Sequence, residues 1–565
     1  MLIVSSADPG PLRAYLSSAR LQNHDEHGEA LSEERRSLSG FLGSASLAIM
    51  PLSPKTYTFL CGFFAALGSV TFGYDLGIIA SVLPSTNFLN TVGNPDEEVT
   101  GLITAILLLG AFASNLIVGN VADFAGRRIA IIVAVIIFLV GGTIQTAAQN
   151  LGMMLAGRFF AGWGIGMLAM LAPLYQAEIA HPSIRGRLTT LQQLMLGIGA
   201  LIASFIGYAC YTTLDGYQAQ WRVPLAIQMV PAIPLGLFIL LLPESPRWLA
   251  MKGRNDEVLE TLARLHSHGD TNDTFVQSEY LDIVTSVETE KVETAHAWRK
   301  IFSSPSQMRR VMLGITLQFS AQMTGVSCIQ YYSPQIFASI GIDAGLTLLL
   351  QSCNSIVAIC GEVACVMLVD RLGRRWPLIW ANIASSCTFV IGTCIIAIYP
   401  AGSGNTAAAG AFVTMTWIFN FFFSAAIGPL TWAYPVEIFT SATRAKATAI
   451  TSSAAWIANF MIAQVSPPAF ANIGWRYYLV FAICGFTNAF TIWCFFPETA
   501  NRSLEEMDEY FSFKNMPLFV PAAKVPEVGR FTREEEMARG ETIRDVDSTH
   551  KEDLVGEKAH IEHNA

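Results

Sequence analysis

The chain has 565 residues, of which 52% are hydrophobic and only 14% are charged. An ordinary soluble domain carries roughly 25% charged residues, so the composition argues against a soluble globular protein. The net charge of −9 arises mainly in the terminal regions, and no basic cluster of the kind that binds nucleic acid is present.

The charged residues are unevenly distributed along the chain. Residues 1–55 hold 11 of them, 244–310 hold 20 and 498–565 hold 25, which leaves 23 of the 79 for 56–243 and 311–497. Two long charge-poor blocks separated by a charged segment cannot face water in full. We therefore predict a polytopic protein of the lipid bilayer.

The first segment, 1–55, is mixed polar and carries both charge signs. It has no apolar stretch and cleavage site of the kind that marks a secretory signal peptide. We expect a disordered cytoplasmic tail. Met50 lies seven residues before the first apolar stretch and is an alternative start to Met1.

The apolar stretches are continuous, which indicates transmembrane helices rather than the alternating strands of a barrel. A helix needs about 20 apolar residues to cross a bilayer. Twelve stretches qualify, at approximately 57–84, 99–121, 129–148, 151–180, 189–210, 222–242, 311–340, 345–369, 377–399, 410–438, 447–470 and 475–496. The fold class predicted is all-α, with 56–243 and 311–497 as two bundles of six helices, 244–310 as a linker and 498–565 as a second tail.

The basic residues of the short loops set the orientation, because Lys and Arg concentrate on the cytoplasmic side. With the N-terminus inside, the outer loops hold only Arg222 and Arg476. The inner loops then hold Arg127, Arg128, Arg185, Arg187, Arg371, Arg374, Arg375, Arg444 and Lys446. We therefore expect both termini and the linker to be cytoplasmic.

The two halves repeat three short motifs in the same order. Gly126-Arg-Arg128 returns as Gly373-Arg-Arg375, 247 residues later. Glu178 returns as Glu437 at an offset of 259, and Pro243-Glu244 returns as Pro497-Glu498 at an offset of 254. A duplication of six helices is typical of transporters that bind substrate between their halves near the midplane.

These motifs resemble the sugar porter family of the major facilitator superfamily, especially its fungal members. The resemblance covers about 56–510. It is carried by Gly73-Tyr-Asp75, Gly126-Arg-Arg128, Gly157-Arg158, Pro173-Leu-Tyr175 to Glu178, Arg185-Gly-Arg187, Pro243–Leu249, Gly325 to Pro334, Gly428-Pro429 to Trp432, Glu437-Ile-Phe439 and Pro497–Thr499.

The resemblance implies two six-helix bundles that rock about a central site, with short cytoplasmic helices in the linker. It also implies a cytoplasmic gate of loop charges, in which Glu178 contacts the Arg127/Arg128 loop and Arg187, and Glu437 contacts Arg375 and Arg444. Opposite charges at helix ends can hold one side shut and separate when it opens. The expected gate residues are Arg127, Arg128, Glu178, Arg187, Glu244, Arg375, Glu437, Arg444 and Glu498.

Three charges remain deep inside the predicted spans: Asp75, Arg158 and Glu362. Ionisable groups in the hydrocarbon region are costly and indicate a functional site. Asp75 and Arg158 lie at the same depth, about 12 Å below the outer surface at 1.5 Å per residue, so they can pair. An arginine neighbour favours the carboxylate while burial favours the neutral acid, so the proton occupancy of Asp75 can change with conformation.

In the proton-linked symporters that the chain resembles, the matching Asp is the proton site and the matching Arg is its partner. We accordingly expect Asp75 to take the proton and Arg158 to modulate it. Glu362 has no counterpart in the family pattern, and it either faces the central cavity as a second protonatable group or pairs with a neighbouring helix.

Sugar recognition needs amides for the hydroxyl groups and aromatic faces for the C–H side of the ring. Gln193, Gln322, Tyr331 and Trp432 match family sugar-contacting positions. The expected substrate-binding residues are Phe72, Gln193, Gln322, Ser327, Tyr331, Asn354, Trp432, Trp456 and Asn459.

The chain departs from the glucose and xylose pattern at four positions that are usually polar or amide. They are Ala321, Ser327, Ala358 and Ala455. Fewer hydrogen-bonding groups and a roomier pocket put simple glucose specificity in doubt.

The function predicted is import of a sugar, a hexose or pentose, by proton symport at the plasma membrane. The alternatives are a facilitative uniporter, a carrier of a polyol, disaccharide or quinate-like compound, and a transporter-like sugar sensor. The sequence carries no enzyme motif. We expect a monomer that binds no metal and no cofactor and depends on the proton gradient alone.

Overall fold

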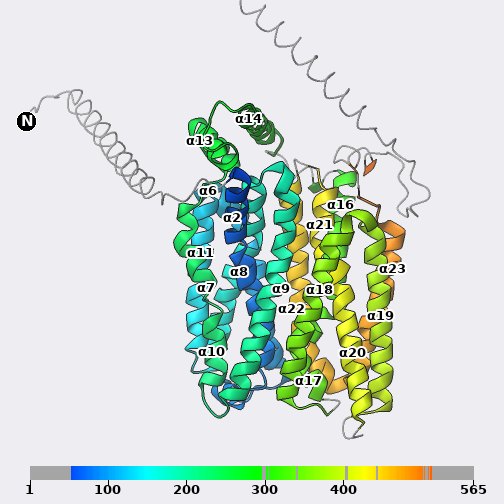
Figure 1. Cartoon of the computed structure of the whole chain (residues 1–565). Helices are drawn as coiled ribbons and strands as arrows, with labels where there is room; N and C mark the ends of the chain where they lie inside the picture. Colours follow the sequence, from blue (N-terminus) through cyan, green and yellow to red (C-terminus); the bar gives the residue numbers. More distant parts are fainter. Residues whose placement is uncertain are drawn as a thin grey trace, which may run out of the picture.

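The computed structural model describes residues 53–294, 301–302, 304–338, 341–400, 405–440, 443–500, 502, 507 and 510–511, without the side chains of 182–190, 289–294, 370 and 445. The predicted tails therefore lie almost entirely outside the described residues. Within the described part of the chain the structure is helical, with no strand. Two groups of long, roughly parallel helices stand side by side (Figure 1).

The first group holds the helices that precede the linker. They are α2 (Pro54–Ala65), α3 (Leu67–Val82), α4 (Thr86–Val92), α5 (Glu97–Asn115), α6 (Val118–Ala125), α7 (Arg127–Thr146), α8 (Leu151–Ile179), α9 (Pro182–Thr213), α10 (Ala219–Ile227), α11 (Ala232–Phe238) and the 3₁₀ turn η1 (Ile239–Leu241).

Three helices of the linker lie at one end of the first group (Figure 1). They are α12 (Pro246–Met251), α13 (Asn255–His266) and α14 (Thr274–Thr294). Val258 and Leu262 of α13 pack with Leu249 of α12 and Val276 of α14 in a small core of their own. Thr58 of α2 also donates a hydrogen bond to the Leu265 carbonyl at 2.8 Å, which fixes α13 against the bundle.

The second group holds the helices that follow the linker. They are α16 (Pro305–Gln322), α17 (Val326–Ala338), α18 (Ala344–Leu372), α19 (Arg375–Ile398), α20 (Thr406–Phe422), the π-helical η2 (Phe423–Ile427), α21 (Gly428–Ile438), α22 (Arg444–Ile473), the 3₁₀ turn η3 (Gly474–Arg476) and α23 (Tyr477–Phe495).

Ten helical runs among the described residues are long and apolar enough to cross a membrane. The last of these, Lys446–Phe495, contains both α22 and α23. Counting these two helices separately and adding α16–α17 gives the twelve predicted spans. The pair α16–α17 is not among the ten. The helix α16 begins with the polar run Pro305–Arg310, and the chain leaves the helix before α17 at Gly325, where φ is +88°.

Two predicted spans are less regular than the sequence suggested. The span expected at 222–242 is divided into α10, α11 and η1. Pro231 lies at the start of α11 and Pro234 in its first turn, and a proline removes a backbone donor and crowds the preceding turn. The span expected at 410–438 contains the π-helical η2 just before Gly428-Pro429, and such turns are frequent at functional sites.

The outward surface of both groups is apolar. Ile136, Leu237, Met367, Trp380 and Phe490 are all more than half exposed. Exposed apolar area on this scale is not tolerated in water and marks contact with a membrane or a partner. Together with the ten apolar runs, it identifies a multi-pass membrane protein.

The two groups meet along three helix pairs, α3 with α17, α5 with α22, and α9 with α18. Within the first group, α3 crosses α9 closely because Gly73 has no side chain. A Cβ atom built on Gly73 would lie 1.9 Å from the Leu196 carbonyl oxygen. The glycine of the Gly73-Tyr-Asp75 motif therefore allows the close approach of α3 to α9, two residues before Asp75.

Candidate functional site

Asp75 of α3 and Arg158 of α8 are buried inside the first group, at 0% and 2% exposure. Each lies within electrostatic range of the other. Within the described part of the chain, neither carboxylate oxygen of Asp75 has a hydrogen-bond partner, and the same holds for Nε and Nη1 of Arg158. The predicted pair is thus brought together but not joined by a direct bond.

An ionised carboxylate in this position destabilises the folded protein. Burying a carboxylate without hydrogen bonds costs several kcal/mol, and binding a proton removes that cost. Arg158 partly offsets it and is also within electrostatic range of Tyr331 and Tyr332, which belong to α17 of the other half. The site therefore lies at the boundary between the two groups, where their relative movement would change its environment.

Two contacts between predicted sugar-site residues lie at this boundary. The ring of Phe72, on α3, packs on Trp456 of α22 with centroids 5.4 Å apart. Asn459, also on α22, donates to the Tyr331 hydroxyl at 3.4 Å. These residues come from three helices and both halves, as a site between bundles requires.

Glu362 lies against α9 of the opposite half. The Gln193 amide donates to its Oε1 at 3.4 Å, and a Cβ on Gly197 would lie 2.3 Å from its Oε2. Glu362 is 5% exposed, and Oε2 has no hydrogen-bond partner among the described residues. The two options left open by the sequence converge, because the neighbouring helix that Glu362 contacts carries a predicted sugar-binding amide.

The other predicted sugar-site residues lie on the second group. Ser327 donates to the Gln322 side-chain oxygen at 3.0 Å. Asn354 is 5% exposed and its side-chain oxygen lacks a partner in the described structure. Trp432 follows the π-helical turn and is 41% exposed. These residues belong to α16, α17, α18 and α21, and no hydrogen bond among the described side chains joins them to Gln193.

The linker end of the first group carries a carboxylate on a glycine turn. Glu244 accepts hydrogen bonds from the backbone N–H groups of Arg127 at 3.2 Å and Ser245 at 2.9 Å. Gly126, at φ +92°, makes space for the Glu244 carboxylate, because a Cβ atom at this position would lie 2.8 Å from a Glu244 side-chain oxygen. Burial raises the pKa of Glu244 above its ordinary value, while these N–H groups and Arg128 oppose the shift.

The second group repeats this arrangement. Glu498 accepts from the backbone N–H groups of Arg374 at 2.8 Å and Arg375 at 3.0 Å, beneath Gly373 at φ +80°. The hydroxyl of Tyr434 donates to the Pro497 carbonyl at 2.8 Å, just as Tyr175 donates to Pro243 at 2.6 Å in the first half. Glu244 and Glu498 therefore cap helices rather than bridge the two halves.

The two predicted gate glutamates each bind an arginine of their own half. Arg127 binds Glu178 through two hydrogen bonds of 2.7 and 2.8 Å. Glu437 binds Arg374 at 3.1 Å, which corrects the expected partner Arg375. The reason is the repeat itself, because Arg374 occupies the position of Arg127.

The remaining gate residues point to carbonyl groups or lie outside the description. Arg128 donates to the Leu240 carbonyl, Arg375 to that of Trp493, and Arg444 to that of Phe439 at 3.5 Å. The side chain of Arg187 is among those not described, so its expected contact with Glu178 stays a prediction.

One polar network was missed by the sequence analysis. Ser69 donates to the Gln192 side-chain oxygen, Gln192 donates to Gln176, and Gln176 donates to the Gly62 carbonyl. The network joins α2, α3, α8 and α9 on the linker side of Asp75. The signal was available, because amides inside apolar spans need partners and Gln192 is adjacent to Gln193. Among the described residues, no group of His, Cys, Asp or Glu could hold a metal ion.

The comparisons with known proteins agree with this geometry. A family model described as "Sugar (and other) transporter" matches residues 61–511. The chain belongs to the sugar transporter family. This family is one of transporters, and it confirms the resemblance to the sugar porters of the major facilitator superfamily.

Individual relatives cover most of the chain. The MFS-type transporter criB of Aspergillus cristatus is 33% identical over 452 residues, which are 80% of this chain and 92% of that protein. A high-affinity glucose transporter of Kluyveromyces lactis is 30% identical over 494 residues, covering 84% and 89%. The xylose transporter XylE of E. coli, in a structure titled as a proton:xylose symporter, superposes with a TM-score of 0.67 at 24% identity, covering 81% and 99%. The fold is therefore that of the major facilitator transporters.

Proposed function

We propose that the protein imports a sugar together with a proton by alternating access between its two halves. The observation that carries the proposal is Asp75, a carboxyl at 0% exposure without a hydrogen-bond partner in the described structure. Arg158 and the α17 tyrosines lie in electrostatic range, so movement of one half against the other changes the cost of charge on Asp75. The similarity to a glucose transporter and to a proton:xylose symporter supports the same chemistry.

The sugar would bind between α3, α9, α17 and α22. Gln193 and Asn459 supply amides, and Phe72 and Trp456 supply aromatic faces. The four positions that lack the usual polar residue favour a substrate other than glucose itself, and a hexose or pentose fits the remaining groups. Gln322, Ser327, Asn354 and Trp432 would complete the site from the second half.

Glu362 would contact the sugar as well. In the structure the Glu362 carboxylate accepts a hydrogen bond from the Gln193 amide. A bound sugar hydroxyl would accept this hydrogen bond in its place. A protonated carboxyl both donates and accepts hydrogen bonds, so Glu362 can replace an amide that this chain lacks, and it lies one turn from Ala358. These contacts support the proposal that Glu362 is the second protonatable group of the site.

The arginine distribution supports a plasma-membrane orientation with both termini and the linker in the cytoplasm. The linker-end cluster of Arg127, Glu178, Arg374 and Glu437 would then form the cytoplasmic gate. We propose a monomeric carrier without enzyme activity, driven by the proton gradient and without a bound cofactor or nucleic acid.

The test is uptake by the purified protein in proteoliposomes with an imposed proton gradient. Labelled hexoses, pentoses, polyols, disaccharides and quinate are supplied with and without a protonophore. We expect one class to accumulate above equilibrium and the protonophore to abolish accumulation. Asp75→Asn should still exchange labelled for unlabelled substrate but no longer accumulate it.

The matched control is Asp256→Asn, an exposed position on α13, which should accumulate as the wild type does. Accumulation that survives Asp75→Asn would contradict the assignment of the proton site. A wild type that only equilibrates and ignores the protonophore would be a facilitative carrier instead.

A further inference from the structure

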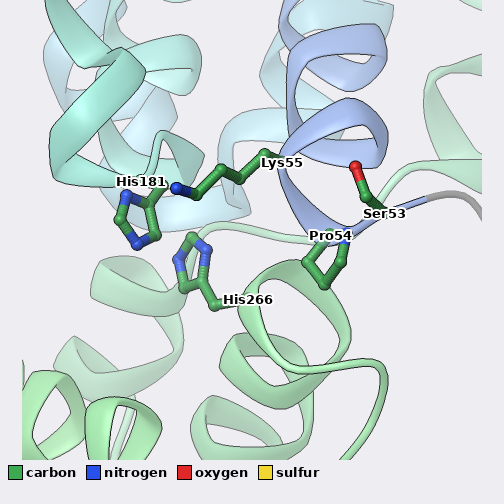
Figure 2. Close-up of a pocket in the computed structure, with 5 residues that line it drawn as sticks. All are labelled: Ser53, Pro54, Lys55, His181 and His266. Carbon is green, nitrogen blue, oxygen red and sulfur yellow. The ribbon is translucent and has the colours of Figure 1, made fainter.

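A cavity on the linker side of the first group has no part in the proposed transport path. Its volume is about 270 Å³, and it is lined by Ser53, Pro54, Lys55, His181 and His266 (Figure 2). Three segments meet there: the start of α2, the connection between α8 and α9, and the end of α13. Three of these five described residues carry basic nitrogens, and none of the five is acidic.

The two imidazole rings are held in place by their neighbours. His181 stacks on Phe275 of α14 at 4.7 Å between centroids and meets His266 edge-on at 5.3 Å. The His266 side chain is 2% exposed, with Nε2 3.5 Å from an oxygen of Glu279. Figure 2 shows the Lys55 side chain extended toward His181, and both residues line the cavity with His266.

This grouping favours a bound anion. Lysine amines carry a positive charge, and imidazoles gain charge between about pH 5 and 8. The charged groups that face the rings are Lys55 from α2 and Glu279 from α14, while Arg264 of α13 lies over the Tyr57 ring at 5.5 Å. One carboxylate does not balance the positive charge that forms when both rings are protonated.

We propose that this cavity binds a small phosphate monoester, such as a sugar monophosphate, on the linker side of the protein. The Lys55 amine and the imidazole N–H groups are donors that form strong, charge-assisted bonds to phosphate oxygens. The Ser53 hydroxyl can accept or donate toward the alcohol part. A cavity of about 270 Å³ lies just below the usual range for ligand sites, so it admits a monophosphate rather than a nucleotide.

The site would tie the linker to the first bundle, because its donors come from both. In the orientation proposed above it opens to the cytoplasm, where kinases convert imported sugars into phosphate esters. Binding at this cavity does not depend on proton coupling or on the sugar site, so its test is independent of the transport proposal.

The experiment measures thermal unfolding of the purified full-length protein in detergent. The probes are inorganic phosphate, glucose 6-phosphate and sulfate, each titrated at pH 6 and pH 8. A ligand that binds only the folded state raises the melting temperature in a saturable manner. We expect saturation with all three probes, with the tightest binding for glucose 6-phosphate.

Variants test the donors one at a time. Lys55→Gln and His181→Gln should each weaken binding about tenfold or more, as expected for loss of a hydrogen bond to a charged group. Lys252→Gln is the matched control, since Lys252 is exposed on the same side of the protein but does not line the cavity. Sulfate stays doubly charged at both pH values, so tighter sulfate binding at pH 6 would report the imidazoles.

Three results would overturn the proposal. The first is a melting temperature that does not respond to the soluble probes at either pH. The second is an equal response in the wild type and both cavity variants. The third is a melting temperature that rises when a phosphatidylinositol phosphate is added to the detergent but not with any of the soluble probes, which would make this face a lipid contact rather than a site for a soluble phosphate ester.

Discussion

Three arginine–glutamate ion pairs on the linker side of the protein differ in how far they are buried. Comparing them tests whether burial determines how much each ion pair stabilises the fold. Arg127–Glu178 is nearly buried, with side chains 5% and 7% exposed. Arg374–Glu437, its counterpart in the second half, is 18% and 29% exposed. Arg254–Glu257 of α13 is 48% exposed on both sides. The perturbation is the same in each, a Glu→Gln change that keeps shape and removes charge.

The expected costs follow from burial. Removing one partner of a buried ion pair costs about 3–5 kcal/mol when the remaining charge is left uncompensated. This range is the upper bound for Glu178→Gln, because Arg127 keeps its ion pair with Asp123 at 3.2 Å. An exposed pair contributes about 0.2–1 kcal/mol, which applies to Glu257→Gln. For Glu437→Gln we expect about 1–3 kcal/mol, the usual cost of leaving a partly buried donor unsatisfied.

The assay is thermal unfolding of each purified variant in the same detergent, with sugar uptake measured alongside. We expect the loss of melting temperature to rank Glu178→Gln above Glu437→Gln above Glu257→Gln. Because Glu257→Gln makes the same chemical change at an exposed site, it controls for charge alone. An equal loss in all three, or the largest loss in Glu257→Gln, would refute the argument from burial.

Further predictions address the site and the packing. Gly73→Val should cost about 1–3 kcal/mol of stability because its side chain would overlap the Leu196 carbonyl, while Gly119→Ala, with open space around it, should melt like the wild type. Glu362→Ala should raise the KM for the sugar about tenfold. Glu362→Gln should raise it less, because glutamine keeps both a hydrogen-bond donor and an acceptor. If uptake kinetics show an unchanged KM in both variants, Glu362 does not belong to the sugar site. Burial raises the pKa of Glu244, so its stabilising contribution is fully present below the unfolded value near 4.5 and is lost as pH rises through the folded value. The difference in melting temperature, wild type minus Glu244→Gln, should therefore be largest near pH 4 and decrease toward pH 7. A difference that does not change with pH would contradict this prediction.

The spans could be predicted from the sequence because apolar length is a strong signal that needs no knowledge of tertiary contacts. The internal breaks could not be predicted as well. Gly325 and Pro231 were visible, but whether a glycine or proline bends, ends or merely interrupts a helix depends on the neighbours that satisfy the freed backbone groups. The π-helical turn before Gly428 depends on tertiary packing in the same way.

The sequence predicted which residues belong to the site better than it predicted which residues they contact. Asp75, Arg158 and Glu362 stood out because charge inside an apolar span is rare. Their contacts required the fold, since the sequence could not show that Glu362 lies on Gln193 of the opposite half. That Glu437 binds Arg374 and not Arg375 was predictable in principle, because the repeat already aligned Arg374 with Arg127.

The arginine–glutamate bonds described at the linker ends, and the glutamates that cap α7 and α19, all join residues of the same half. Among the described residues, each half therefore carries its own set of these end contacts, and the covalent connection through the linker is not needed to form them. A chain cut between α13 and α14 and expressed as two fragments would keep both sets intact. Such fragments are suited to reassembly in one membrane, which offers a route to placing a different label on each half.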